Sequence, residues 1–243
     1  MKGRLVPREA LSAAQRDAMF ALLALHFDGV AREHFEGVAR ERFEADLAEK
    51  NWVLLIEDER RLCGFSTLSF YETRYRGEAV AVVYSGDTIE ERGAWGTPEL
   101  PRSWIAAVRT LRRQSPRVPL YWLLLTSGFR TYRFLPVFFR EFFPHPERPP
   151  DVPARLAFLA EERLGARYLK QRGIVRFAQP QRLRAELAEI PEGRRRDPYV
   201  AFFLERNPGW REGDELVCLT EIAYSNLTPA GRRMWGPREG DTA

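Results

Sequence analysis

Lysine, cysteine and histidine are scarce in this sequence of 243 residues. The only lysines are Lys2, Lys50 and Lys170, beside two cysteines and three histidines. Cys63 and Cys218 lie in apolar segments without a CxxC motif, which predicts buried, reduced thiols rather than a disulfide framework. His26 and His34 fall in helical patterns and have no partner at metal-ligand spacing, so we expect packing or solvation for both. No metal site is expected.

Long apolar runs are also missing. Nothing approaches the roughly 18 apolar residues of a membrane helix, and the opening MKGRLVPREAL has no uninterrupted apolar core of a signal peptide. We therefore expect a cytoplasmic protein with no membrane partner. The net charge of +4 comes from arginines interspersed with glutamates, without a dense basic face interleaved with aromatics, which disfavours nucleic-acid binding. Hydrophobic and charged contents of 44% and 30% are typical of a globular chain with a packed core.

The first half of the chain predicts two helices followed by three strands. Ser12 and Gln15 form a capping box before a helical pattern that ends near Phe27, and a second helical pattern runs to about Lys50. The period then changes to that of strands over 52–56, 62–70 and 79–89, with Gly64 as a candidate bulge and a polar turn over 74–77. Such short connections are typical of antiparallel neighbours.

The third strand runs into a turn that contains glycines. After Ser85-Gly86-Asp87-Thr88, the segment Arg92-Gly93-Ala94-Trp95-Gly96-Thr97 precedes an amphipathic helix that carries Trp104 and Val108 on its apolar face. We expect Thr97 to cap this helix and Pro98 to be its first residue. Free amides and the positive end of a helix dipole suit a phosphate or pyrophosphate group, whereas an ordinary bend is the alternative interpretation.

The second half is less regular. Residues 118–126 predict a central strand buried on both faces and parallel to 79–89, because a helix connects the two. An aromatic helical segment over 131–143 contains Pro136, which should end or kink it. After a break at 145–150 we expect a helix over 152–164, a strand over 173–177, a helix over 180–190, a strand near 215–222 and a frayed tail from Pro229.

This order of elements resembles the GNAT superfamily, the Gcn5-related N-acetyltransferases, over residues 10–143. The resemblance implies an α/β (α+β) fold with a mixed, mostly antiparallel sheet flanked by helices. It implies an acyltransferase core over 1–145 and an extension over 146–243 that completes the sheet and the acceptor side. The alternative is that the two parts form one continuous domain. In that family an R/Q-x-x-G-x-G/A turn holds the pyrophosphate of acyl-CoA.

The corresponding turn departs from the family motif, because Trp95 stands at the central glycine and Thr97 at the last small residue. Three consequences stay open: the phosphates bind in a shifted pose, an acyl carrier protein presents the pantetheine, or donor binding has been lost. The residues that the resemblance assigns to the donor, acyl-CoA (acetyl-CoA) or an acyl-pantetheine carrier, are Thr88, Ile89, Arg92, Gly93, Ala94, Gly96 and Thr97.

Two residues are candidates for the chemistry. Asp87 follows the point where the resembling family separates two strands, and its carboxylate there would take a proton from the acceptor; the alternative is that it secures a bulge. Tyr132 lies where the family has a tyrosine that protonates the departing thiolate; the alternative is an aromatic core residue.

The sequence therefore predicts transfer of an acyl group from a pantetheine thioester to a small amine or hydroxyl acceptor by direct attack. A non-catalytic scaffold of the same fold, which binds a protein partner or an acyl carrier protein, is the alternative. A homodimer is compatible with either.

Overall fold

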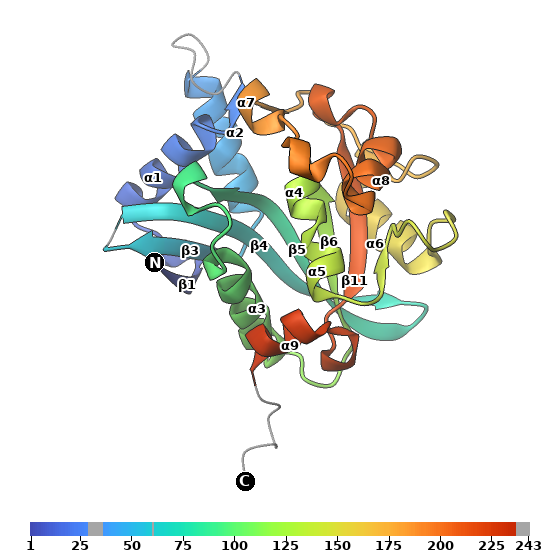
Figure 1. Ribbon diagram of the computed structural model, residues 1–243. Helices are drawn as coiled ribbons and strands as arrows, with labels where there is room; N and C mark the ends of the chain where they lie inside the picture. The colour runs from blue at the N-terminus through green and yellow to red at the C-terminus, as the bar shows by residue number, and fades with distance from the viewer. Residues whose placement is uncertain (29–35, 60, 237–243) are drawn as a thin grey trace.

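We describe residues 1–28, 36–59 and 61–236 of a computed structural model of the chain. A nine-stranded sheet with helices on both sides forms its body (Figure 1). The strands of this sheet, in spatial order, are β1 (Lys2–Pro7), β3 (Trp52–Asp58), β4 (Arg61–Tyr75), β5 (Glu78–Glu90), β6 (Leu120–Thr126), β11 (Glu215–Glu221), β9 (Ile174–Val175) and β8 (Tyr168–Leu169), with β7 (Phe142–Phe143) paired to β11. A separate pair joins β2 (Phe27–Asp28) to β10 (Arg182–Leu183).

All of these pairs are antiparallel except β5 with β6. The predicted mixed, mostly antiparallel sheet flanked by helices is confirmed. Helix α3 (Glu99–Arg112) makes the crossover that a parallel pair requires. All seven residues of β6 are buried, as its continuous apolar sequence predicts.

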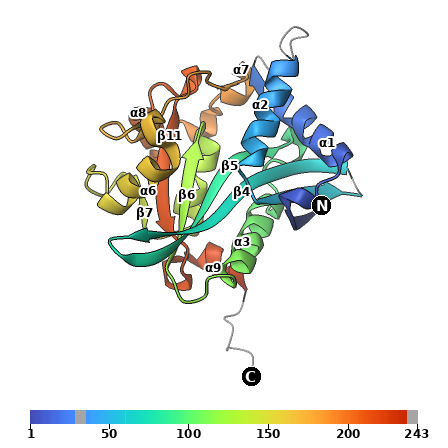
Figure 2. The ribbon, with the colours of Figure 1, turned by 180° about the vertical axis from the view of Figure 1, so that it is seen from behind.

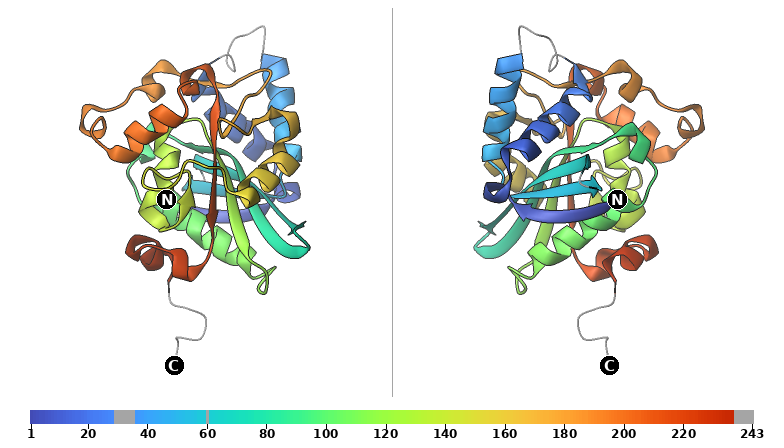
Figure 3. Two further views of the ribbon diagram at one scale, coloured as in Figure 1. Left: turned by 90° about the vertical axis from the view of Figure 1, so that its right-hand side faces the viewer. Right: turned by 90° about the vertical axis from the view of Figure 1, so that its left-hand side faces the viewer.

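Helices cover both faces of the sheet (Figures 2 and 3). Along β3, Val53 and Leu55 pack into a core with α1 and α2, whereas Leu54 and Ile56 pack on the other face with α3, as strand alternation requires. The helices are α1 (Ala13–Ala24), α2 (Glu36–Ala48) and α6 (Ala154–Leu164) on the first face, α3, α4 (Phe129–Tyr132), α5 (Phe134–Phe138), α8 (Pro198–Arg206) and α9 (Pro229–Trp235) on the second, and α7 (Ala185–Ala188). Within the described ranges no helix is long and apolar enough to span a membrane.

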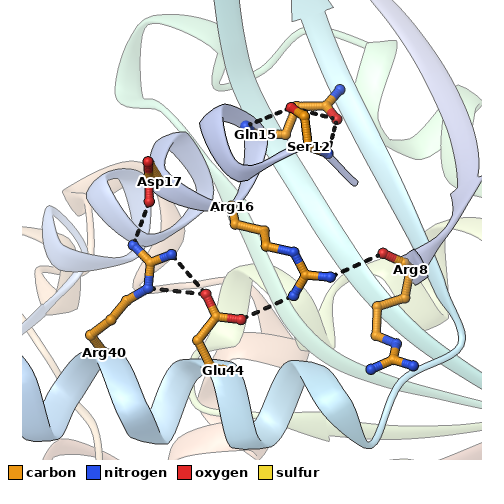
Figure 4. Close-up of polar contacts among 7 residues, drawn as sticks. All are labelled: Arg8, Ser12, Gln15, Arg16, Asp17, Arg40 and Glu44. Carbon is orange, nitrogen blue, oxygen red and sulfur yellow. Dashed lines mark hydrogen bonds and ion pairs between the residues drawn. The ribbon is translucent and has the colours of Figure 1, made fainter. Parts of the chain in front are cut away.

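Helix α1 begins as predicted. The hydroxyl of Ser12 accepts from the amide of Gln15, and the Gln15 side chain accepts from the amide of Ser12. Polar contacts then join α1 to α2, because Glu44 accepts from Arg16 at 3.0 Å and from Arg40 at 2.7 Å, and Arg40 also donates to Asp17 (Figure 4). These contacts position α2 over the sheet, where its next turn reaches the site described below.

The turn and bulge predicted around β4 are confirmed. Arg76 and Gly77 both have positive φ, of 52° and 84°, and close a tight hairpin between β4 and β5. The ladder between β3 and β4 shifts register beside Gly64, where Ile56 pairs with Gly64 and Glu57 with Leu62.

Several boundaries differ from the predictions. Pro98 is the N-cap of α3, and Thr97 makes no capping hydrogen bond, so the predicted Thr97 cap is wrong. The aromatic helix divides into α4 and α5 at Arg133, because Pro136 has no amide to donate to the carbonyl of Tyr132.

The segment after residue 145 also differs in part. Residues 180–190 form β10 and α7 instead of one helix, and residues 229–235 form α9, capped by Thr228, instead of a frayed tail. Helix α6 and strands β9 and β11 lie where helix and strands were expected, and β11 pairs with β6 in the middle of the sheet. Strand β1, which pairs with β3, was not predicted.

Candidate functional site

The two parallel strands separate after Ser85. Their register runs from Ala81 opposite Leu120 to Ser85 opposite Leu124 and then ends, although β5 continues to Glu90 and β6 to Thr126. The indole nitrogen of Trp122 donates to the hydroxyl oxygen of Ser85 at 2.8 Å, within the core. The two strands therefore separate from a defined residue onward, which leaves an opening between them.

A bulge on the other edge of β5 lies at the same point. Ser85 pairs with Leu68 and Thr88 with Ser66, so Gly86 and Asp87 together lie opposite the single residue Thr67. Such a bulge bends the strand and redirects its side chains. It therefore contributes to the separation of β5 from β6.

Gly86 is needed because there is no room for a side chain. A Cβ at this position would lie 2.7 Å from Cε of Lys50 and 2.7 Å from Oγ1 of Thr67. Lys50 is buried and pairs with Asp46 across one turn, with Nζ 2.8 Å from Oδ2. This rare lysine thus fills the space that glycine leaves and holds α2 against the bulge.

A cavity of about 750 Å³ lies at this opening. Its walls come from α2, from β5 past the bulge, from α4 and α5, and from loops after residue 165, so residues from distant parts of the sequence meet there. Among the residues that line it are Arg42, Asp46, Tyr84, Asp87, Thr88, Trp95, Ser127, Phe129, Arg130, Phe134 and Glu215.

Three carboxyl groups share the floor of the cavity. Burial, together with the charge of Asp46, raises the pKa of Asp87 to about 7, although Lys50 and Arg42 act in the opposite direction. Burial and the charge of Asp87 raise the pKa of Glu215 to about 8, against a hydrogen bond from Ser127. Asp87 comes from β5 and Glu215 from the first residue of β11, on the two sides of the opening. Among the described residues no group of His, Cys, Asp or Glu is arranged to hold a metal ion.

Tyr84 lies beside these carboxyl groups. Its ring is 5.5 Å from Nζ of Lys50, just past the end of α2, and 4.6 Å from the guanidinium carbon of Arg163 on α6. The side chain is only 6% exposed yet lines the cavity, and burial raises the pKa of its hydroxyl.

The predicted donor turn reaches the cavity only in part. Thr88, Ile89, Gly96 and Thr97 line it, whereas Arg92, Gly93 and Ala94 form a short 3-10 turn outside its lining. Gly96 is required by its positive φ of 84°, but a Cβ on Gly93 would meet nothing within 4 Å.

Trp95 forms one wall of this turn. Its indole nitrogen donates to the carbonyl of Glu90 at 2.8 Å, which places the ring against the cavity. The amides of Ala94, Trp95 and Thr97 donate to the carbonyls of Glu91, Arg92 and Ala94 within the turn. Three amides of the motif thus already have partners.

Tyr132 does not lie in the cavity. It is 0% exposed, its hydroxyl donates to the carbonyl of Pro144 at 2.8 Å, and its ring packs against Phe203 at 5.9 Å. Burial raises the pKa of this hydroxyl well above its usual value. The prediction that Tyr132 protonates a leaving group is wrong for this conformation, because α4 turns that side chain into the core.

The remaining candidates behave as expected. His26 is buried, with Nδ1 2.9 Å from the carbonyl oxygen of Leu22 and Nε2 3.0 Å from that of Glu90, and it also lines the cavity. Cys63 and Cys218 are free and buried, as predicted. His34 lies outside the described residues.

Sequence patterns missed most of the charged groups in the cavity. Asp46, Glu215 and Arg130 belong to no motif, and only the scarcity of lysine could have drawn attention to Lys50. Their proximity arises from packing of elements that are remote along the chain.

No protein-family model and no curated protein matches the sequence. Solved structures do: a probable N-acyltransferase from Enterococcus faecalis (15% identity, 55% of this chain, 31% of that chain, TM-score 0.42) and a GCN5-related N-acetyltransferase from Kribbella flavida (16%, 58%, 34%, 0.39). An acyl-CoA N-acyltransferase from Pseudomonas aeruginosa is 16% identical over 50% of this chain and 77% of its own, with a TM-score of 0.36. In fold, this chain is similar to GNAT acyltransferases at low identity. It spans about a third of the length of the first two structures.

Proposed function

We propose that this protein transfers an acyl group from a pantetheine thioester to a small amine or hydroxyl acceptor bound beside Asp87. The observation that carries the proposal is the separation of β5 from β6 after Ser85, directly before a carboxyl group with a pKa of about 7. An opened strand pair offers backbone amides and carbonyls to an extended ligand, and the amide groups of pantetheine can pair with them as an added strand would.

Asp87 suits the role of proton acceptor. A general base works best when its pKa lies near the operating pH, so a carboxylate with a pKa of about 7 is a far stronger base than an ordinary one. Asp87 takes the proton that the acceptor nitrogen or oxygen loses as that atom bonds to the acyl carbon and the carbon–sulfur bond breaks. The donor supplies an acyl group activated as a thioester.

The acceptor side is suited to a cationic group. Asp46, Asp87 and Glu215 surround it, whereas Lys50 is already paired with Asp46. A positively charged amine placed among them would lower the raised pKa values of Asp87 and Glu215 and favour their ionised forms. An amine acceptor therefore supports the ionisation of its own base.

The pantetheine part of the donor fits this cavity better than its phosphates fit the neighbouring turn. The opening at Gly86 suits pantetheine, but the turn at 92–97 does not suit the phosphates as the family motif would, because Ala94, Trp95 and Thr97 use their amides internally. This mismatch, with Tyr132 in the core, is what favours the alternative of a non-catalytic scaffold, and it equally favours a carrier protein as donor.

Two measurements separate these functions. Calorimetric titration with acetyl-CoA, longer acyl-CoAs and an acyl-loaded carrier protein should show binding of at least one donor, and that donor should acylate an amine with a rate that rises with pH through about 7. Asp87→Asn should lower turnover about 100-fold or more while it leaves donor binding and the fold intact. Asp151→Asn, at an exposed carboxylate outside the cavity lining, is the matched control. Absence of binding to every donor would contradict the proposal, and binding without turnover would identify a scaffold.

A further inference from the structure

We infer that Arg92 and Arg130, which lie against the ring of Trp95, bind a phosphate group of the donor in place of the amides of the 92–97 turn. The inference rests on the proposed function, because it supposes that the cavity takes a pantetheine thioester. The shared chemistry is a phosphate ester of pantetheine, supplied either by CoA or by the phosphopantetheine arm of a carrier protein.

The usual anion site at this position is weakened in several ways. Three turn amides are already bonded, Pro101 removes another from the first turn of α3, and Glu99 places a carboxylate there. Glu99 also accepts from the hydroxyl of Ser103 at 3.1 Å, which keeps the carboxylate beside the helix start. A negative charge at this end of the helix repels the phosphate that the helix dipole would attract.

Two guanidinium groups lie close to the same indole. The guanidinium carbon of Arg130 is 4.5 Å from the centroid of the Trp95 ring and 4.8 Å from that of Phe129, and the guanidinium carbon of Arg92 is 5.6 Å from the Trp95 ring. Arg130 lines the cavity and comes from α4, directly after the end of β6. Trp95, which displaces the family glycine, thus positions two cations where the motif would have offered amides.

Among the ion pairs between described residues, none includes Arg92 or Arg130, whereas the neighbouring Arg133 pairs with Asp197 at 2.8 Å and Arg61 pairs with Glu91. Burial and the charge of Arg92 lower the pKa of Arg130, yet a guanidinium stays protonated at neutral pH. The charge of Arg92 acts on Arg130, so an anion that contacts both guanidinium groups is favoured.

Arg130 also has guanidinium N–H groups that remain available to a ligand. It donates to the carbonyls of Leu187 at 2.6 Å and Glu189 at 3.4 Å, and a guanidinium carries more N–H groups than two carbonyls use. These bonds hold the side chain in place and reduce the entropy lost when an anion binds. They also give Arg130 a structural role, which the test must separate from phosphate binding.

The test compares ligands with and without phosphate. Affinities for CoA, 4'-phosphopantetheine and pantetheine are measured by calorimetry for the wild type and for Arg130→Gln, Arg130→Lys and Arg92→Gln, with Arg148→Gln as control. Arg148 is exposed, pairs with Glu141 at 2.6 Å and does not line the cavity. Thermal unfolding of each variant reports the structural role, and the exposed Arg92 keeps the test informative if Arg130→Gln is unstable.

The expected result is that each Gln variant weakens CoA binding roughly tenfold and leaves pantetheine binding unchanged. Arg130→Lys should retain part of the affinity, and the salt dependence of CoA binding should decrease in the Gln variants. An effect on 4'-phosphopantetheine as large as that on CoA indicates that the phosphate shared with a carrier protein is the one bound; an effect on CoA alone indicates its further phosphates. Both results support the inference.

Two other results overturn it, in distinguishable ways. If the ratio of CoA to pantetheine affinity is the same in the wild type and in both Gln variants, the inference fails and the proposed function survives. If the wild type binds none of the three ligands and no acyl-loaded carrier protein, the proposed function fails and the inference fails with it.

Discussion

The indole nitrogen of Trp122 donates a 2.8 Å hydrogen bond to the hydroxyl of Ser85, which is the last residue of β5 that pairs with β6. The bond joins the two strands one residue before Gly86, where a side chain would collide with Lys50 and Thr67. Strands β5 and β6 therefore pair up to Ser85 and separate from Gly86 onward. The cavity lies where the two strands separate.

Ser85→Ala should destabilise the protein by about 1–3 kcal/mol, because it leaves the buried N–H of Trp122 without an acceptor. Equilibrium unfolding in urea measures the change. Thr110→Ala removes an exposed hydroxyl that bonds to Ala106 within α3, and its effect should stay within about 0.5 kcal/mol. If both substitutions lower the free energy of unfolding by the same amount, the hydrogen bond between Trp122 and Ser85 makes no particular contribution to stability.

Gly86→Ala and Gly93→Ala form a matched pair of glycine substitutions. The first should cost about 1–3 kcal/mol and displace Lys50, since the new Cβ would lie 2.7 Å from Cε of Lys50, whereas the second meets nothing within 4 Å. Thermal unfolding compares their stability, and donor titration compares their binding. A larger loss for Gly93→Ala than for Gly86→Ala would contradict the packing at the bulge.

Asp87→Asn should make stability less dependent on pH. The folded-state pKa of Asp87 is about 7, above the ordinary value near 3.9 of an unfolded chain, so the carboxyl group stabilises the fold most at low pH. That contribution is lost as pH rises from about 4 through about 7. The free energy of unfolding should therefore fall between pH 5 and pH 8 less steeply in Asp87→Asn than in the wild type.

Glu215, with a pKa of about 8, should retain part of this slope in the variant. Asp151→Asn, at an exposed site, should follow the wild type. Parallel curves for Asp87→Asn and the wild type would contradict the raised pKa.

Tyr132→Phe should destabilise the protein by about 1–2 kcal/mol, because the carbonyl of Pro144 loses its buried donor. Turnover should change by less than about threefold, since the hydroxyl faces the core and contributes no proton transfer. Urea unfolding and steady-state kinetics with the donor found by titration give the two values. A 100-fold loss of turnover in a stable variant would restore Tyr132 to the acid role expected from the resemblance.

Sequence patterns predicted local features well where neighbours along the chain decide them. The capping box of Ser12 and Gln15, the hairpin turn at Arg76 and Gly77 and the buried strand 120–126 all depend on a few adjacent residues. Predictions failed where distant contacts decide. Residues 180–190 pair in part with β2 instead of forming one helix, and residues 229–235 form α9 beside α3.

Among the site residues, too, local sequence was enough for some predictions and distant contacts decided the others. Asp87 could be identified because it follows Gly86 in the strand that separates from its neighbour in the resembling family, and it lies in the cavity. The side chain of Tyr132 could not be oriented from its place in an aromatic segment, because packing against Phe203 and Phe142 decides which face of α4 is buried. Asp46 and Glu215 approach Asp87 only because α2 and the start of β11 both contribute to the wall of the same cavity.

By itself, the sequence determined the succession of helices and strands, the parallel crossover through α3 and the bulge beside Gly64. Periodicity and turn chemistry suffice for these features because they act over short stretches of chain. Only the tertiary structure decided which carboxyl groups face the opening and which arginines lie against Trp95. The physical reason is that pKa values, burial and side-chain direction are set by neighbours in space, and these come from segments up to 169 residues apart in the chain, as Asp46 and Glu215 are (215 − 46).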